Sequence, residues 1–144
     1  PFTTLQPMVG VIHFDDFHRG TMADIPGIIE GAHANIGLGH EFLRHIMRCR
    51  LLLFVVDAAG SEGRDPISDL ETLRKEVKLY SAELAKRPWC IVANKIDLPE
   101  AAENLNHIKE RFKRTKIIPI SANDGTGLDA LRKYLEGRIA RPIA

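Results

Sequence analysis

The 144-residue sequence lacks features that mark several specialised classes of protein. Its two cysteines, Cys49 and Cys90, are far apart, so neither metal-ligand spacing nor a disulfide framework is indicated and we expect reduced thiols. The longest apolar run, from Leu51 to Val56, is far shorter than the roughly 20 residues that a membrane-spanning helix needs. No charged and then apolar leader begins the chain. We therefore expect no membrane span, and a cytoplasmic protein, or an organellar one if a targeting segment lies outside this chain.

The sequence also lacks an excess of charge of either sign. Its 20 Lys and Arg residues against 19 Asp and Glu residues give a net charge of +1, which makes no global case for a nucleic-acid partner. The basic residues are gathered locally, in segment 109–116 and along the last predicted helix and tail. They are Lys109, Arg111, Lys113, Arg114 and Lys116, followed by Arg132, Lys133, Arg138 and Arg141. Such clusters are compatible both with a solvated helix face and with an RNA-facing patch.

What the sequence does contain is the composition and pattern of one globular α/β domain, with 44% hydrophobic and 27% charged residues. Two strands, 8–14 and 19–24, flank a polar turn around Asp15 and Asp16 and predict a hairpin. Helices are expected at 41–50, at 66–84 with Asp65 as the cap and Pro66 as the first helical residue, and at 101–112. A last helix is expected after a Thr126 cap, with Leu128, Leu131 and Leu135 facing inward. Strands are expected at 51–56, 89–93 and 117–120. This order predicts a mostly parallel sheet with helices on both faces and the hairpin as its one antiparallel edge.

Polar side chains follow the apolar strand 89–93, in the run Asn94-Lys95-Ile96-Asp97. A carboxylate held after a strand can accept two parallel hydrogen bonds from the ring N–H and exocyclic amine of guanine, whereas adenine offers no matching donor pair. Lys95 can lay its methylene stem over a base face with its ammonium in water, and Asn94 can tie the loop to its neighbours. By itself, N-K-x-D is equally compatible with an ordinary polar strand end.

Three further short motifs lie beside predicted strands. Ser121-Ala122 ends the next strand, so its backbone N–H groups are expected near the same base. In Asp24-Ile25-Pro26-Gly27, the carboxylate can hold Mg2+ through water, and the glycine lets a backbone N–H approach a terminal phosphate. Thr3-Thr4 supplies hydroxyls that can complete magnesium coordination. Each motif alone is also explained as an ordinary turn.

Taken in chain order, T-T, D-x-x-G, N-K-x-D and S-A form a joint signal for a guanine-nucleotide switch domain. The runs "PFTTLQPMVGVI", "ADIPGIIEGAHANIGLGHEFLRHI" and "NKIDLPEAAENL" resemble the Obg family of ribosome-assembly GTPases, and the resemblance covers residues 1–144. It implies a Ras-like G domain of the P-loop NTPase class that hydrolyses GTP to GDP with Mg2+. It also implies the large ribosomal subunit, including its rRNA, as the partner. We expect a monomer.

The resemblance also implies roles for individual residues. Thr4 becomes the magnesium-binding threonine of the first switch, while Asp24 holds the ion through water and Gly27 contacts the γ-phosphate. Asn94, Lys95 and Asp97 become the guanine readers. The other implied nucleotide-binding positions are Phe2, Thr3, Leu5, Gln6, Ile25, Pro26, Ile96, Ser121, Ala122 and Asn123. No catalytic residue is identified.

The sequence departs from the family pattern because no Gly-Lys pair, and hence no G-x-x-x-x-G-K-[ST] phosphate loop, occurs in it. Since that loop holds the β- and γ-phosphates, nucleotide affinity of the isolated chain is expected to collapse. The first strand of such domains, which lies between the hairpin and strand 51–56, is expected to be missing too. We therefore interpret residues 1–144 as a partial G domain that is poorly stable alone.

Ile28 stands where many switch GTPases have a water-orienting glutamine, which implies slow intrinsic hydrolysis assisted by another group or a partner. His40 or Glu30 is an alternative group for that role. Otherwise His33, His40 and His45 are expected in surface or capping roles rather than at a metal, because His40 and His45 are five residues apart and so lie on different helix faces.

Two other functions stay open. One is a non-catalytic RNA- or protein-binding module derived from a truncated GTPase fold, which the missing phosphate loop favours. The intact N-K-x-D and D-x-x-G argue against it, because a fold freed from guanine binding has no physical need for Asp97. The other is a related GTPase of the translation-factor class with a different partner.

Overall fold

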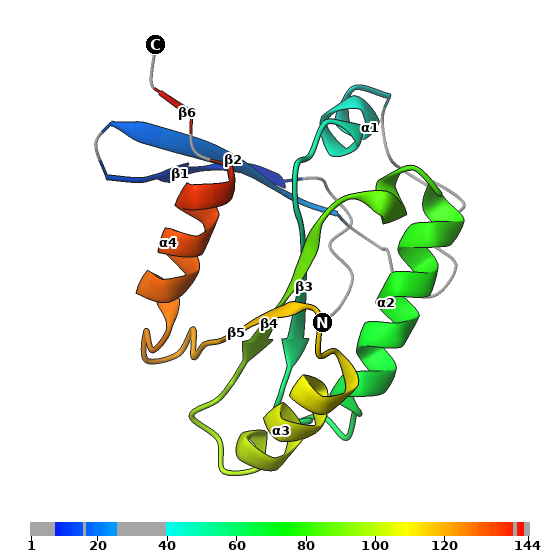
Figure 1. Cartoon of the computed structure of the whole chain (residues 1–144), viewed down its shortest axis with the longest axis vertical. Helices are drawn as coiled ribbons and strands as arrows, with labels where there is room; N and C mark the ends of the chain where they lie inside the picture. Colours follow the sequence, from blue (N-terminus) through cyan, green and yellow to red (C-terminus); the bar gives the residue numbers. More distant parts are fainter. Residues whose placement is uncertain (1–7, 16, 26–39, 140, 143–144) are drawn as a thin grey trace. The chain divides into compact units, whose positions relative to one another are not determined.

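The computed structural model describes residues 8–15, 17–25, 40–139 and 141–142 (Figure 1). The chain forms two compact units, one of residues 1–50, 73–87 and 135–144 and one of residues 51–72 and 88–134. The elements, in chain order, are β1 (Met8–His13), β2 (His18–Asp24), α1 (His40–Met47), β3 (Leu52–Asp57), α2 (Pro66–Tyr80), the 3-10 helix η2 (Leu84–Lys86), β4 (Trp89–Asn94), α3 (Ala101–Arg111), β5 (Lys116–Pro119), α4 (Leu128–Ile139) and β6 (Arg141–Pro142).

The predicted hairpin is confirmed in the first unit. Strands β1 and β2 pair antiparallel, with Met8 opposite Asp24 and His13 opposite Arg19. The two-residue strand β6, which the sequence pattern did not predict, pairs antiparallel with β2. The end of α4 lies beside the hairpin in Figure 1, where Glu136 Oε2 accepts a hydrogen bond from the backbone N–H of Asp15 over 2.9 Å.

A parallel sheet in the order β3-β4-β5 is the centre of the second unit. Ala93 of β4 packs in one apolar cluster with Ala101 of α3, and its neighbour Val92 packs in another with Leu131 of α4. Because successive residues of a strand point to opposite faces, α3 and α4 cover opposite faces of this sheet. The predicted α/β class, with helices on both faces of a parallel sheet, is therefore confirmed.

The hairpin, however, is not an edge of the parallel sheet. Among the described strands, β1, β2 and β6 form one three-stranded sheet, while β3, β4 and β5 form another. This differs from the single mixed sheet predicted from the sequence. The two described sheets share no hydrogen-bond ladder.

Helix α2 begins as predicted and ends earlier. Asp65 Oδ1 accepts the backbone N–H of Ile67 over 3.2 Å, which confirms the cap before Pro66. The apolar spacing predicted a helix up to Leu84, but α2 ends at Tyr80 and Leu84 lies in η2. The Ser81 hydroxyl accepts the N–H of Leu84 over 3.1 Å, and such local side-chain bonds compete with continuation of a helix.

The start of α4 corrects two predictions. The Thr126 hydroxyl does not cap the helix but donates to Asp124 Oδ1 over 2.6 Å, and α4 begins only at Leu128. Leu128 was predicted to face inward, yet it is the first residue of α4 and 40% of it is exposed. Leu135 is buried as predicted.

Cys49 is partly buried and Cys90 is buried, and neither forms a disulfide within the described residues. Within the described residues, the search for a helix long and apolar enough to cross a membrane finds none.

Candidate functional site

The candidate site lies at the carboxyl ends of the three parallel strands. Asp57 at the end of β3 stands opposite Asn94 at the end of β4, and Ala93 stands opposite Pro119 at the end of β5. The loops that follow the three strands therefore begin at one edge of the sheet. This is the edge at which open α/β sheets bind their ligands.

Asn94 ties the middle loop to both neighbours, through its side-chain amide on one side, as predicted, and through its backbone carbonyl on the other. Its Oδ1 accepts the backbone N–H of Ala122 over 3.0 Å, from the loop after β5, and also that of Lys95 over 2.8 Å. Its carbonyl accepts the N–H of Ala58 over 2.9 Å, from the loop after β3. These hydrogen bonds hold the N-K-x-D loop in a fixed position before any ligand arrives.

Asp97 is oriented by the loop after β5. The Ser121 hydroxyl donates to Asp97 Oδ1 over 2.9 Å, and Ser121 itself is fully buried. Asp97 is exposed, so the protein fixes its carboxylate from one side while the residue faces solvent. That is the chemistry required to receive a pair of N–H donors from a base.

The N–H groups of the S-A motif are engaged within the protein. Ser121 N donates to the Thr126 carbonyl over 2.8 Å, and Ala122 N donates to Asn94 as described above. Asn123 follows in the same loop and is exposed. Contact between this loop and a base stays a prediction.

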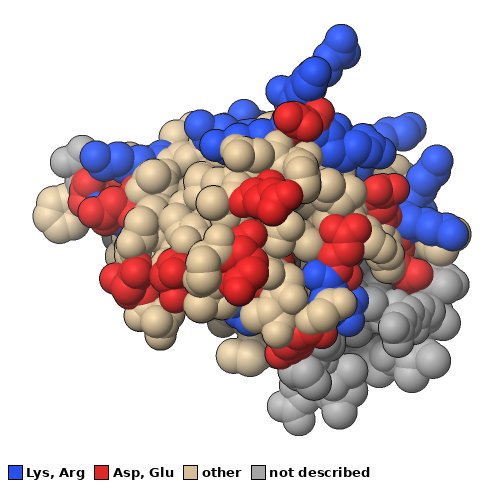
Figure 2. Space-filling model, turned by 90° about the horizontal axis from the view of Figure 1, so that it is seen from below, with Lys and Arg blue, Asp and Glu red and all other residues tan. Residues whose placement is uncertain are grey.

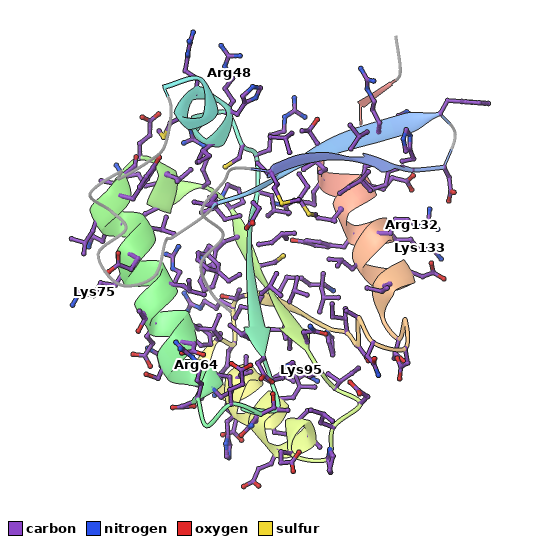
Figure 3. All side chains as sticks on the ribbon, turned by 180° about the vertical axis from the view of Figure 1, so that it is seen from behind. Arg48, Arg64, Lys75, Lys95, Arg132 and Lys133 are labelled. Atoms are coloured by element: carbon purple, nitrogen blue, oxygen red, sulfur yellow. The ribbon has the colours of Figure 1, made fainter. Side chains whose placement is uncertain are left out.

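The Lys95 ammonium is paired within the protein, which the sequence did not predict, although the side chain is 39% exposed. Its Nζ lies 3.0 Å from Asp57 Oδ2 and donates to the Ser61 hydroxyl over 2.8 Å. Lys95 also has a φ of 67°, in the left-handed region that a residue with a side chain seldom adopts. In Figure 3 it lies at the arrowhead end of β3 and β4.

Sequence reasoning missed Asp57 and Ser61. The Asp57 carboxylate accepts the backbone N–H groups of Ala59 (3.0 Å) and Ser61 (3.1 Å) and the Ser61 hydroxyl, besides the Lys95 ammonium. Burial raises the pKa of Asp57, but these hydrogen bonds together outweigh it and lower the pKa below its usual 3.8. The available signal was the position of Asp57, directly after an apolar strand, as Asn94 follows the next one. Ser61 carried no such signal.

The phosphate and magnesium side of the predicted site falls mainly on residues outside the described part of the chain. These are Phe2, Thr3, Thr4, Leu5, Gln6, Pro26, Gly27, Ile28, Glu30 and His33. Asp24 is described: it is the last residue of β2 and is exposed. A carboxylate oxygen there fits the preference of Mg2+ for oxygen ligands. His40 and His45 both lie in α1.

Comparison with known families bears on these motifs directly. The family model described as "50S ribosome-binding GTPase" matches residues 1–95, which contain the T-T and D-x-x-G runs and the first two residues of N-K-x-D, Asn94 and Lys95. The chain belongs to this family. The match therefore covers two of the four motifs in full, while Asp97 and the S-A motif lie beyond it.

Individual relatives show which of the 50S ribosome-binding GTPases the chain resembles in sequence. The chain is 64% identical to the GTPase Obg of Akkermansia muciniphila over 94% of its own length, and 53% identical to that of Desulfitobacterium hafniense over 90%. The resemblance to Obg proteins seen in the sequence is therefore confirmed. The chain spans 39% and 31% of the length of these two relatives.

A solved structure supports the fold. The chain resembles a point variant of Aquifex aeolicus Era that was crystallised with GDP and AlF4-, with a TM-score of 0.66 over 95% of this chain and 46% of that one. At 24% identity, this likeness concerns the fold alone. It is consistent with the G-domain class expected for a 50S ribosome-binding GTPase.

Proposed function

We propose that the intact protein is a switch GTPase that binds GTP and GDP with Mg2+ and hydrolyses GTP. In this proposal residues 1–144 are the part of its G domain from the first switch to the last helix. The observation that carries the proposal is the Ser121–Asp97 hydrogen bond, which fixes a carboxylate at the loop edge of a parallel sheet. Membership of the 50S ribosome-binding GTPases supports it.

Guanine recognition is proposed to rest on the N-K-x-D loop. Asp97 accepts the ring N–H and the exocyclic amine, and Lys95 covers a face of the base. Asn94 holds the loop to its neighbours through Ala122 and Ala58. Adenine would leave the Asp97 carboxylate without matching donors, and that loss supplies the discrimination.

The switch itself is proposed to involve the residues at the amino-terminal end. Thr4 and, through water, Asp24 hold Mg2+, and the Gly27 N–H meets the γ-phosphate. The magnesium ion, when bound, neutralises charge on the phosphate oxygens. Phe2, Thr3, Leu5, Gln6, Ile25, Pro26 and Ile28 supply the surrounding backbone. Loss of the γ-phosphate would release both segments, as in other nucleotide switches.

The proposed partner is the large ribosomal subunit during its assembly. The intact protein is proposed to be a cytoplasmic monomer. The support for this partner is the family description and a basic surface formed by Lys109, Arg111, Lys113, Arg114 and Lys116. All five residues are exposed. Arg111 lies 5.0 Å from the centre of the Phe112 ring, and Lys116 Nζ lies 5.7 Å from that of Tyr134. Lys and Arg side chains extend outward from the surface in Figure 2, as phosphate contacts require.

The alternative is a non-catalytic module that docks through the basic surface without nucleotide. The lack of a Gly-Lys pair favours it for this chain in isolation. The hydrogen bonds that order Asn94 and Asp97 favour the GTPase, because docking through the basic surface does not need them.

The test is a titration of a fluorescent GDP analogue, with Mg2+, into the chain and into a version extended upstream by the next strand and phosphate loop. The proposal predicts that the extended protein binds GDP in preference to ADP, hydrolyses GTP and melts cooperatively. It predicts that the 144 residues alone bind weakly and melt without a cooperative transition. An extended, folded protein without guanine preference would contradict the proposal and favour the alternative.

A further inference from the structure

The Lys95 ammonium is held by two groups of the loop between β3 and α2. Its Nζ lies 3.0 Å from Asp57 Oδ2 and 2.8 Å from Ser61 Oγ. Asp57 stands opposite Asn94 in the register of β3 and β4, so the ion pair bridges two neighbouring strands at their ends. The side chains of Lys95 and Asp57 are 39% and 21% exposed, so the pair is partly shielded from solvent.

Both ends of the Lys95 side chain are therefore fixed. At its backbone end, the left-handed conformation of Lys95 turns the chain sharply after β4. At the other end, the carboxylate that holds the ammonium is itself ordered by the N–H groups of Ala59 and Ser61. The methylene groups between these points lose most of the rotamer freedom of a solvated lysine.

We propose that Asp57, supported by Ser61, is a positioning residue for guanine-nucleotide binding that holds the Lys95 stem where it packs on the face of the base. This inference rests on the proposed function and deepens it, since it concerns the same loop. Asp57 acts through Lys95 and does not contact the base. A stem that is already ordered loses less conformational entropy when the base arrives, so the ion pair raises affinity.

The roles of Asp57 and Asp97 then separate. A methylene stem on the face of a base does not read its edge, because every purine presents a similar face. Loss of Asp57 therefore lowers the affinity for GDP and ADP by the same factor, whereas loss of Asp97 changes the ratio between them. Loss of a residue that only stabilised the fold would change neither the two affinities nor their ratio, as long as the variant protein remains folded.

The test compares GDP affinity of the upstream-extended protein carrying Asp57→Asn, Lys95→Met or both. Asp57→Asn keeps the shape of the side chain and removes its charge, and Lys95→Met keeps an unbranched apolar stem. We expect each single change to weaken GDP binding by about three- to tenfold, which is the loss of affinity that corresponds to the free energy of one partly exposed ion pair. The double variant should bind no more weakly than Lys95→Met, and the ratio of GDP to ADP affinity should stay unchanged.

The chain offers a matched control in Asp69, which pairs with Arg64 over 2.9 Å in the same unit and whose side chain is likewise 21% exposed. Asp69→Asn removes an equivalent ion pair without touching Lys95 and should leave GDP affinity unchanged. If Asp57→Asn fails to fold, Ser61→Ala removes one of the two contacts of the ammonium and should weaken GDP binding in the same direction.

Unchanged GDP affinity in folded Asp57→Asn protein would overturn the inference, and so would losses that multiply in the double variant. Neither result would affect the proposed function, because that function is tested by whether the upstream-extended protein without substitutions binds GDP. If the upstream-extended protein without substitutions showed no preference for guanine, both the proposed function and this inference would be overturned.

Discussion

The Ser121 hydroxyl donates a hydrogen bond to Asp97 Oδ1 over 2.9 Å, so the loop after β5 orients a carboxylate in the loop after β4. Ser121 is fully buried, and hydrogen bonds to charged groups are among the stronger ones. Ser121→Ala should therefore weaken GDP binding about tenfold, measured by calorimetric titration. Ser81→Ala, which removes the hydroxyl that accepts the Leu84 N–H, should leave binding unchanged. Equal affinities for the Ser121 variant and the parent would contradict this orientation of Asp97.

Two glycines in the loop before α4 give a stability prediction. Both have positive φ, 87° at Gly125 and 80° at Gly127, but only at Gly127 would an added Cβ clash with the backbone, at the Pro119 carbonyl oxygen. Gly125→Ala should lower the free energy of unfolding by about 1–2 kcal/mol, from the backbone conformation alone. Gly127→Ala should cost more than about 4 kcal/mol. Denaturant unfolding of the upstream-extended protein measures both losses, and equal losses would contradict the described turn.

Acid should weaken the interactions that the Asp57 carboxylate makes with Lys95, Ser61 and Ala59. Burial raises the pKa of Asp57, but its hydrogen bonds with Ser61, Lys95 and Ala59 lower it below 3.8 overall. Because the folded pKa is the lower one, the unfolded chain binds more protons, and the stabilisation is present above pH 3.8 and lost as pH falls through the folded pKa. The difference in free energy of unfolding between the parent and Asp57→Asn should thus be constant from about pH 7 to about 5 and shrink below 3.8. A difference that persists undiminished at about pH 2 would contradict the assignment.

The basic surface predicts salt-dependent association with the large ribosomal subunit. Replacing Lys113 and Arg114 by glutamate should weaken co-sedimentation with 50S particles and reduce the dependence of binding on salt, because fewer counterions are released. A matched control is glutamate at Lys75 and Lys78, two exposed basic residues of α2. Similar loss of association for both pairs would show a general charge effect and contradict a specific role for the basic surface.

The sequence was sufficient to predict most of the elements because their signals are local. The Asp65-Pro66 cap, the apolar run of β4 and the hairpin around Asp15 all depend on neighbouring residues, and each is confirmed. Asn94 was also predicted correctly as the tie between loops, since an amide at a strand end has few other uses.

The features of the candidate site that the sequence did not reveal depend on contacts between segments distant in sequence. The partners of Lys95 are 38 and 34 residues away, so no local pattern could reveal that its ammonium is paired. For the same reason, the sequence showed Asp57 only as the residue that ends a strand, because its pairing with Lys95 joins segments distant in sequence. Likewise, the spacing of Leu128 with Leu131 gave no information about where α4 begins relative to the sheet.

The most direct test of the central claim, that Asp97 reads guanine, is the affinity of the upstream-extended Asp97→Asn variant for GDP and for xanthosine diphosphate. An asparagine presents one acceptor and one donor, which match the ring N–H and the 2-oxo group of xanthine but not the two donors of guanine. The account predicts that the variant binds GDP more weakly and xanthosine diphosphate more tightly than the protein without the substitution. Glu100→Gln, a change to an exposed acid at the start of α3, should alter neither affinity. An Asp97→Asn protein that is folded and still prefers GDP would contradict it.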